Sequence, residues 1–285
     1  QDGLKEDGPN LCGLKWYHNN CYMLAAVQLV ASTNSVRRWA SGEFKEDDSS
    51  EECRTIALAV RGLVLGNEDH ANLGLAGLYH LHCGVDNENG SRKYSIFDVG
   101  QQEDSGMFMA WMADVLPTSI FEQRWNVDIS FSCTNMGCES ATGDMLQKTV
   151  KTSSVDFHLP LGRQRSAATI TADALSLESD DSGFALNECP KCKIRFTGSQ
   201  QTTKKAVAGS FSDLVVVRVQ RVQQSGRGAK KNMSSVGVPQ VLDFGAALGR
   251  YRAVGSVIHV GQSASSGHYV AASRGCLYDN EKIVD

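Results

Sequence analysis

The sequence lacks the signals that mark several large classes of protein. No stretch approaches the roughly 18 uninterrupted apolar residues of a membrane helix, and no charged segment followed by an apolar one opens the chain. We therefore expect neither a membrane partner nor a signal peptide. Basic residues are not in excess, since 28 Lys and Arg stand against 32 Asp and Glu, a net charge of -4 that gives no electrostatic case for nucleic acid. We find no internal repeat, and the 41% hydrophobic and 21% charged composition is that of an ordinary soluble globular protein.

Cysteine is present in an informative pattern. The chain has nine cysteines, an odd number, so at least one would stay unpaired if the others formed disulfides. Four of them form two close pairs, C-x4-C and C-x2-C, a spacing typical of metal ligands. These are Cys133, Cys138, Cys189 and Cys192. We expect them to hold one structural zinc ion with no open position, in a reducing intracellular compartment, cytoplasm or nucleus. The alternative is four cysteines without a metal.

Hydrophobic periodicity predicts an α+β chain. A length of 285 residues suits one elaborated enzyme domain or two coupled subdomains. Helices are expected at 21–33, 54–65 and 104–116, and strands at 127–131, 155–159, 214–219, 257–260 and 269–272. Exposed loops are expected at 173–185 and 223–235, and the segment His80-Leu81-His82-Cys83 is interpreted as a loop or strand without a metal. The outline is a helical lobe followed by a β-rich lobe, as in papain-type enzymes.

Cys21, His268 and Asp279 form a candidate thiol-protease constellation. Cys21 follows two Asn residues, which are good N-caps, so it would open a buried helix whose dipole favours the thiolate. His268 would be the base and then the acid for the leaving amine. Asp279 is the natural group to hold the imidazole in the right tautomer. Taken alone, Cys21 is more simply a small buried hydrophobe and His268 a strand histidine; the joint pattern favours catalysis.

Five segments together carry a resemblance to a known family. They are a Cys box (Gly13-Leu14, Asn19-Asn20-Cys21-Tyr22-Met23 and Gln28), the stretch Gln102 to Phe108, the strand Leu214 to Arg221, a His box (Tyr251, Val257 to Gly261 and Gly267 to Ala271), and Tyr278-Asp279-Asn280. The chain resembles the ubiquitin-specific protease family of papain-like cysteine deubiquitinases, nearly from end to end. The His box is the most specific of these segments, and the stretch from Gln102 is the weakest.

The resemblance implies a papain-like α+β fold and a substrate. It implies one catalytic domain over 1–285, with a helical thumb at about 1–120, zinc-tipped β fingers at about 121–205 and a β palm at about 206–285. The reaction would be hydrolysis of the peptide or isopeptide bond after the C-terminal Gly of ubiquitin, through a Cys-His-Asp triad and a thioester. Ubiquitin and ubiquitinated proteins would be the partners. The residues expected to contact the substrate are Gln102, Asp104, Gly267 and Tyr269.

Three positions depart from the family pattern. The Asn that helps to form the oxyanion hole is Trp16 here, the Gly of the Cys box is His18, and the acidic residue of the Gln102 segment is Met107. We expect the Cys21 backbone N–H to remain as an oxyanion donor. The candidates to replace the lost amide are Asn19, His18 and Asn280. The departures motivate two alternatives, a protease for another ubiquitin-like modifier and a catalytically weak ubiquitin-binding scaffold.

Overall fold

The computed structural model describes the chain in segments. These are residues 12–16, 19–43, 50–83, 103–131, 138, 146–154, 156–160, 192–193, 202–225, 228–243, 249–263, 266–273 and 275–284. The chain divides into two compact units, each described by itself. The first comprises 1–120, 222–233 and 254–285, and the second comprises 121–221 and 234–253. The thumb, fingers and palm boundaries stay a prediction.

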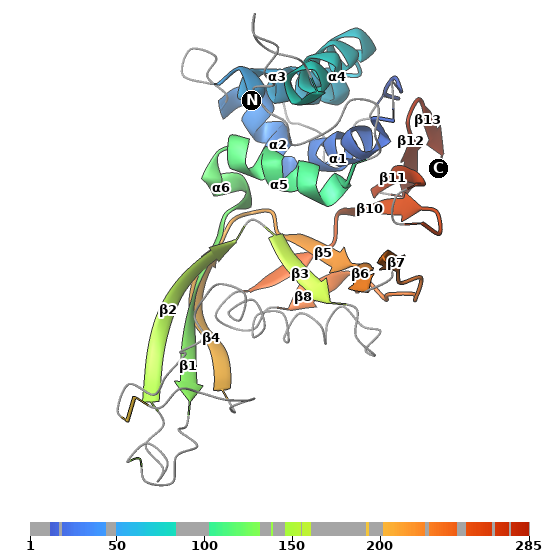
Figure 1. The fold of residues 1–285 in the computed structure, drawn as a ribbon. Coiled ribbons are helices and arrows are strands. Elements are labelled where there is room, and N and C mark those ends of the chain that lie inside the picture. Colours follow the sequence, from blue (N-terminus) through green and yellow to red (C-terminus); the bar gives the residue numbers. More distant parts are fainter. Residues whose placement is uncertain are drawn as a thin grey trace, which may run out of the picture. The chain divides into compact units, whose positions relative to one another are not determined.

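The first unit is built around α1 and its neighbouring helices (Figure 1). Its helices are α1 (Cys21–Ala31), α2 (Asn34–Arg38), the π-helical η1 (Trp39–Glu43), α3 (Glu51–Leu65), α4 (Glu68–Cys83) and α5 (Ser105–Val115). All but one residue of α1 are buried, as its uninterrupted apolar sequence predicts. Tyr22 of α1 packs edge-on against Phe108 of α5, with ring centroids 5.9 Å apart. The residue that follows Cys21 is therefore part of the core of this unit.

Local signals set the ends of α3. The Ser50 hydroxyl accepts a hydrogen bond from the Cys53 N–H at 3.2 Å, an N-cap, and the helix ends at Gly66 with φ of 66°. The three helices predicted from periodicity are confirmed within a few residues as α1, α3 and α5. The interpretation of His80 to Cys83 as a loop or strand is wrong, because these residues form the last turn of α4.

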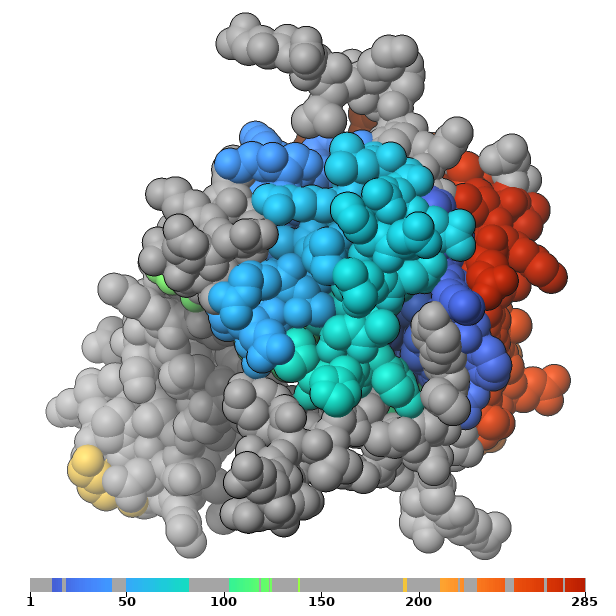
Figure 2. All heavy atoms as spheres, turned by 90° about the horizontal axis from the view of Figure 1, so that it is seen from above, coloured from blue at the N-terminus to red at the C-terminus, as the bar shows by residue number. Residues whose placement is uncertain are grey.

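A four-stranded antiparallel sheet completes the first unit. It contains β10 (Gly255–Val260), β11 (His268–Ser273), β12 (Cys276–Asp279) and β13 (Lys282–Val284), in that order. α1 packs on β11, and Ser273 donates a hydrogen bond to Ser32 at 3.0 Å, just beyond the end of α1. In Figure 2 the red C-terminal strands lie directly beside the dark-blue N-terminal residues. The strand pair predicted at 257–260 and 269–272 is confirmed.

The segment 222–231 is a hairpin in the same unit, although we expected an exposed loop at 223–235. β6 (Val222–Ser225) pairs with β7 (Gly228–Lys231) in antiparallel register. The prediction rested on polar composition, which identifies a solvated loop only when no neighbouring strand satisfies the backbone.

The second unit is β-rich, as the change of pattern after residue 125 predicts. The strands β1 (Gln123–Phe131), β2 (Leu146–Ser154) and β4 (Thr202–Phe211) form an antiparallel sheet in the order β2-β1-β4. β3 (Asp156–Pro160) lies parallel to β5 (Val216–Gln220), and β8 (Val241–Asp243) pairs with β9 (Arg250–Arg252). The short helix α6 (Thr118–Phe121) precedes β1. Within the described residues no helix is both long and apolar enough to cross a bilayer.

Candidate active site

Cys21 is the first residue of α1 and is 3% exposed. Asn20 is the N-cap residue, and its carbonyl accepts the N–H groups of Met23 at 2.9 Å and Leu24 at 3.1 Å. The thiol therefore stands at the positive end of a buried helix dipole, which stabilises a thiolate. The predicted cap is correct in position, although the Asn20 side chain makes no hydrogen bond to the helix N-terminus.

His268 and Asp279 lie on neighbouring strands and face each other. His268 opens β11, Asp279 ends β12, and these two strands pair antiparallel. The His268 Nε2 is 2.6 Å from the Asp279 Oδ1, a short hydrogen bond. When Nε2–H donates to the carboxylate, the lone pair of a neutral imidazole is on Nδ1. Nδ1 is then the nitrogen that can take a proton from a thiol.

The Cys21 thiol lies beside the residue that follows His268. Burial raises the pKa of the Cys21 thiol above its usual range. A hydrogen bond from the backbone N–H of Tyr269 is the largest opposing effect, and the negative charge of Asp279 adds to the rise. The three predicted triad residues thus belong to one unit, and burial of the thiol disfavours its thiolate form. Such a thiol needs a base to remove its proton as it attacks.

The turn after Asp279 is held by the segment before Cys21. The Leu14 N–H donates to the Asn280 carbonyl at 2.9 Å. A Cβ on Gly13 would come 2.3 Å from the carbonyl oxygen of Glu281, so only glycine permits this close backbone approach. Asn280 itself has φ of 52°, a left-handed conformation that Asn tolerates better than most residues. The Gly-Leu of the Cys box therefore has a structural task, which is to fix the turn that carries Asp279.

The candidate oxyanion residues occupy different environments. Trp16 is 48% exposed. Asn19 is exposed and has φ of 64°, while Asn280 is half-buried with its Oδ1 enclosed and lacking a hydrogen-bond partner in the described part of the chain. His18 lies outside the described residues. The replacement of the family's amide stays a prediction.

The residues expected to contact the substrate fall into three groups. Gly267 and Tyr269 flank His268 directly. Asp104 is the N-cap of α5, where its Oδ1 accepts the Met107 N–H at 2.9 Å, so its carboxylate already has a structural role. Gln102 lies outside the described residues. Their contacts with a substrate stay predictions.

The sequence did not predict a contact between Lys231 and His259, which lies near His268. The ammonium of Lys231, on β7, is 2.8 Å from the Nδ1 of His259, on β10. The exposed loop predicted at 223–235 includes Lys231, and His259 lies within the predicted strand 257–260. The only available signal was the alternation of β10, which cannot reveal a partner 28 residues away in sequence.

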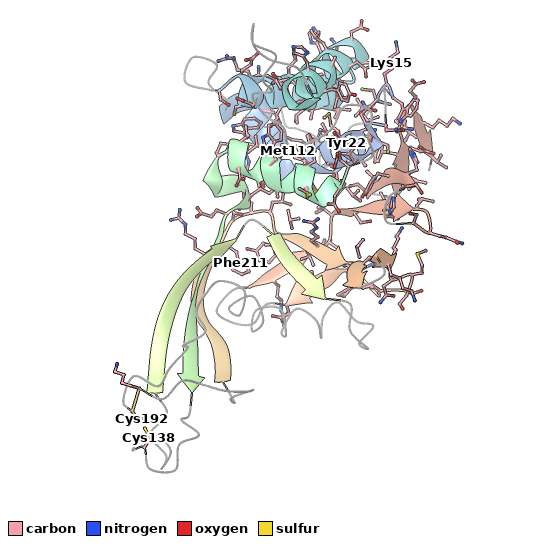
Figure 3. All side chains as sticks on the ribbon, in the orientation of Figure 1. Lys15, Tyr22, Met112, Cys138, Cys192 and Phe211 are labelled. Carbon is pink, nitrogen blue, oxygen red and sulfur yellow. The ribbon has the colours of Figure 1, made fainter. Side chains whose placement is uncertain are left out.

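The zinc-site prediction falls on the second unit, at one end of its three-stranded sheet. Phe131 at the end of β1 lies opposite both Leu146, the first residue of β2, and Thr202, the first residue of β4. Cys138 lies between β1 and β2 in sequence and Cys192 precedes β4, and Figure 3 shows both residues at the end of the sheet where β1 ends. Cys138 is buried, and neither cysteine forms a disulfide within the described residues. Cys133 and Cys189 lie outside them.

Comparisons with known proteins identify a matching family model and similar folds. A family model described as ubiquitin carboxyl-terminal hydrolase matches residues 12–284. A search of curated protein sequences found no match. The chain is similar to a solved structure of the SAGA Ubp8/Sgf11/Sus1/Sgf73 DUB module bound to ubiquitin aldehyde, with a TM-score of 0.69 and 16% identity over 100% of this chain and 67% of that chain. It is also similar to a structure of the yeast SAGA DUB module with an Sgf73 mutant, with a TM-score of 0.68 and 14% identity over 98% of this chain and 65% of that chain.

These structural likenesses concern the fold. At 14 to 16% identity they confirm the predicted papain-like α+β architecture. The chain spans about two thirds of the length of the proteins it matches in these structures.

Proposed function

The chain belongs to the ubiquitin carboxyl-terminal hydrolase family, and we propose that it is a thiol-dependent deubiquitinase that cleaves the peptide or isopeptide bond after the C-terminal Gly of ubiquitin. The observation that carries this proposal is the hydrogen bond from His268 to Asp279, 2.6 Å long, beside a cysteine at a helix N-terminus. The ubiquitin aldehyde in the similar DUB module supports the choice of modifier.

The proposed chemistry begins with proton transfer. The Nδ1 of His268 accepts the proton of the Cys21 thiol while the sulfur attacks the carbonyl carbon of the terminal Gly. The tetrahedral adduct collapses, its C–N bond breaks, and the leaving amine takes the proton from His268. A thioester of ubiquitin remains on Cys21. Water, deprotonated by His268, then attacks the thioester and releases the ubiquitin carboxylate and the thiol. Asp279 stabilises the imidazolium through Nε2 in both steps.

The oxyanion would form at the N-terminus of α1. The Cys21 N–H is the first donor we propose there, because the backbone N–H groups of a helix's first turn have no intrahelical acceptor. Trp16 offers a single ring N–H on a side chain that is 48% exposed, so it does not replace an amide. We propose a side chain of Asn19 or Asn280 as the second donor. Loss of one oxyanion donor costs about 10²–10³ in rate in enzymes of this kind.

A panel of reactive modifiers tests which substrate the site takes. The wild-type protein is incubated with ubiquitin, and separately with other ubiquitin-like proteins, each carrying a C-terminal electrophile, and the adducts are measured by mass spectrometry. We expect one adduct with the ubiquitin probe, on Cys21. Labelling only by another modifier would establish a different substrate. The exposed Met107, which stands where the family has an acidic residue, favours this as the second candidate. Tight ubiquitin binding without any adduct would identify a binding scaffold and contradict the proposal.

We further propose that Cys133, Cys138, Cys189 and Cys192 hold one zinc ion. The four thiolates are a donor set that zinc prefers, and Cys138 and Cys192 lie at the same end of the sheet formed by β1, β2 and β4 (Figure 3). When bound, the ion would crosslink these loops and take no part in the reaction. Thiolate ligands fit the reducing intracellular location that the sequence predicts.

Zinc content gives the corresponding prediction. Protein purified without chelator should carry one zinc per chain, and Cys192→Ser should lower that content and the thermal midpoint, because ligand loss weakens a metal site whose binding energy contributes to folding. The measurements are elemental analysis by plasma mass spectrometry and thermal unfolding. Cys276→Ser on β12 is the matched control and should keep the metal. Wild-type protein without zinc, or equal zinc loss in the control, would refute the site.

A further inference from the structure

Lys231 is a buried cation with a complete set of acceptors. Lys231 is the last residue of β7, and it is 9% exposed. The ammonium is 2.8 Å from the Nδ1 of His259 and donates to the carbonyls of His259 at 3.1 Å and Gly261 at 2.6 Å. An ammonium has three donors and no acceptor, and its burial is costly unless those donors are satisfied. Three acceptors around three donors indicate a site built for this cation.

The state of His259 agrees with its role as an acceptor. Burial lowers the pKa of His259, and the charge of Lys231 lowers it further. Of the other charged groups around the ring, Asp104 before α5 raises this pKa and His268 on β11 lowers it. The lowered pKa favours the neutral ring, whose Nδ1 can accept a hydrogen bond from Lys231.

The two carbonyls held by Lys231 bracket the residue opposite His268. In the antiparallel register of β10 and β11, Val260 is the partner of His268. His259 and Gly261 are the residues immediately before and after Val260. A single side chain from β7 thus fixes both peptide groups around the position that faces the catalytic histidine.

The His259 ring adds two further contacts around His268. A Cβ placed on Gly267 would lie 2.4 Å from the Nε2 of His259, so the ring lies against the residue that precedes His268. The ring also packs on Tyr269, the residue that follows, with centroids 4.6 Å apart. The residues before and after His268 therefore lie against the His259 ring, and Lys231 binds the carbonyls on both sides of Val260, the residue opposite His268.

We propose that Lys231 is a positioning residue for the reaction: by holding His259 and the start of the 261–267 connection, it fixes the backbone that carries His268. The proposal rests on the proposed function of the triad. Lys231 itself touches no reacting atom. Its loss would leave His259 and two carbonyls without their donor and would let β10 and β11 shift at the His268 end.

The test compares Lys231→Met with Lys230→Met. Met keeps the length and apolar stem of Lys and removes the ammonium, while Lys230 is the exposed neighbour on the same strand. We expect Lys231→Met to lower kcat for a ubiquitin C-terminal amide by about 10- to 100-fold, because small misplacements of a catalytic group are costly, with KM changed less than about threefold. Lys230→Met should behave as wild type. A folded Lys231→Met variant with the wild-type kcat would overturn the proposal.

A second variant shows whether Lys231 acts through His259. His259→Phe keeps a ring against Tyr269 and Gly267 but removes the acceptor. If Lys231 and His259 act together, the fold-loss in kcat of the double variant should be smaller than the product of the two single fold-losses. Losses that multiply would contradict the shared mechanism. Should Lys231→Met fail to fold, His259→Phe carries the same kcat test, because it leaves Lys231 its two carbonyl acceptors.

A spectroscopic measurement separates this proposal from the function it rests on. The ring protons of His259, followed by NMR titration, should show a higher pKa in Lys231→Met than in wild type, since a neighbouring cation is gone. An unchanged pKa would show that the contact is absent in solution and would overturn the proposal. Wild-type protein that neither hydrolyses ubiquitin amides nor reacts with the ubiquitin probe would instead refute the proposed function, whatever the titration shows.

Discussion

Replacing Cys21 with alanine should lower the turnover of a ubiquitin C-terminal amide by roughly 10⁴-fold or more, while ubiquitin binding stays close to wild type. Removal of the nucleophile eliminates the covalent route and leaves only binding and oxyanion stabilisation, and a 10⁴-fold loss corresponds to about 5.5 kcal/mol in the barrier. Because the Cys21 side chain is already buried and small, alanine should change the surface presented to ubiquitin very little.

The matched control is Cys53→Ala. Cys53 is also a buried helical cysteine of the first unit, on α3, and the helix cap there uses its backbone N–H, which alanine retains. Steady-state hydrolysis and equilibrium binding of ubiquitin are measured on all three proteins. A Cys21→Ala variant that keeps more than about a hundredth of the wild-type rate would exclude Cys21 as the nucleophile. Equal losses in Cys53→Ala would point to damaged folding.

The triad could be proposed from sequence because each member has a local signature. Cys21 opens an apolar helix after two Asn residues, and His268 follows a glycine at the start of a strand. Asp279 comes 11 residues after His268, and the antiparallel pairing of β11 with β12 turns that spacing into a 2.6 Å contact. A motif of this kind depends on short-range geometry, which one hairpin supplies.

Helix α4 was missed because its sequence disagrees with helix propensity. It contains Gly74 and Gly77, and glycine in a helix interior usually counts against the assignment. The packing of α3 against α4 explains one of them: a Cβ on Gly74 would lie 2.4 Å from the backbone N of Ala59, and one on Gly62 of α3 would lie 2.2 Å from the N of Ala71. The close approach of two helices decides these positions, and a single sequence does not show which helices will meet.

Lys231 was misplaced for a related reason. The sequence of its hairpin is mostly polar, and polar hairpins usually lie in solvent. Lys231 is buried because His259 on β10 supplies an imidazole and a carbonyl, and Gly261 just after β10 supplies a second carbonyl, 28 and 30 residues away in sequence. Burial of a charge depends on partners brought by tertiary structure, so charge patterning along the chain could not predict it.

Gly267→Ala should lower turnover by about 100-fold, the second largest effect that we expect. A methyl group at this position would lie 2.4 Å from the Nε2 of His259 and 2.5 Å from the carbonyl oxygen of Val260. The ring cannot move aside easily, because Lys231 holds its Nδ1 and Tyr269 packs on its face. The chain must therefore shift at Gly267 itself, and His268 is the next residue. A displacement of about 1 Å at a catalytic group is enough for a loss of this size.

Gly42→Ala is the control, because no heavy atom lies within 4 Å of the Cβ it would add in η1. We expect this variant to have wild-type kcat and KM, which would show that a glycine-to-alanine change in the same unit is harmless where there is space. If Gly267→Ala also turned over at the wild-type rate, the His259 ring would have room to move, and the contacts around His268 would be looser than the structure shows.

If Gly267→Ala loses activity and His259→Ala restores part of it in the double variant, the collision with the ring is the cause. Removal of the ring opens the space that the methyl group needs, whereas the Val260 carbonyl, also near that methyl group, is unchanged by the second substitution.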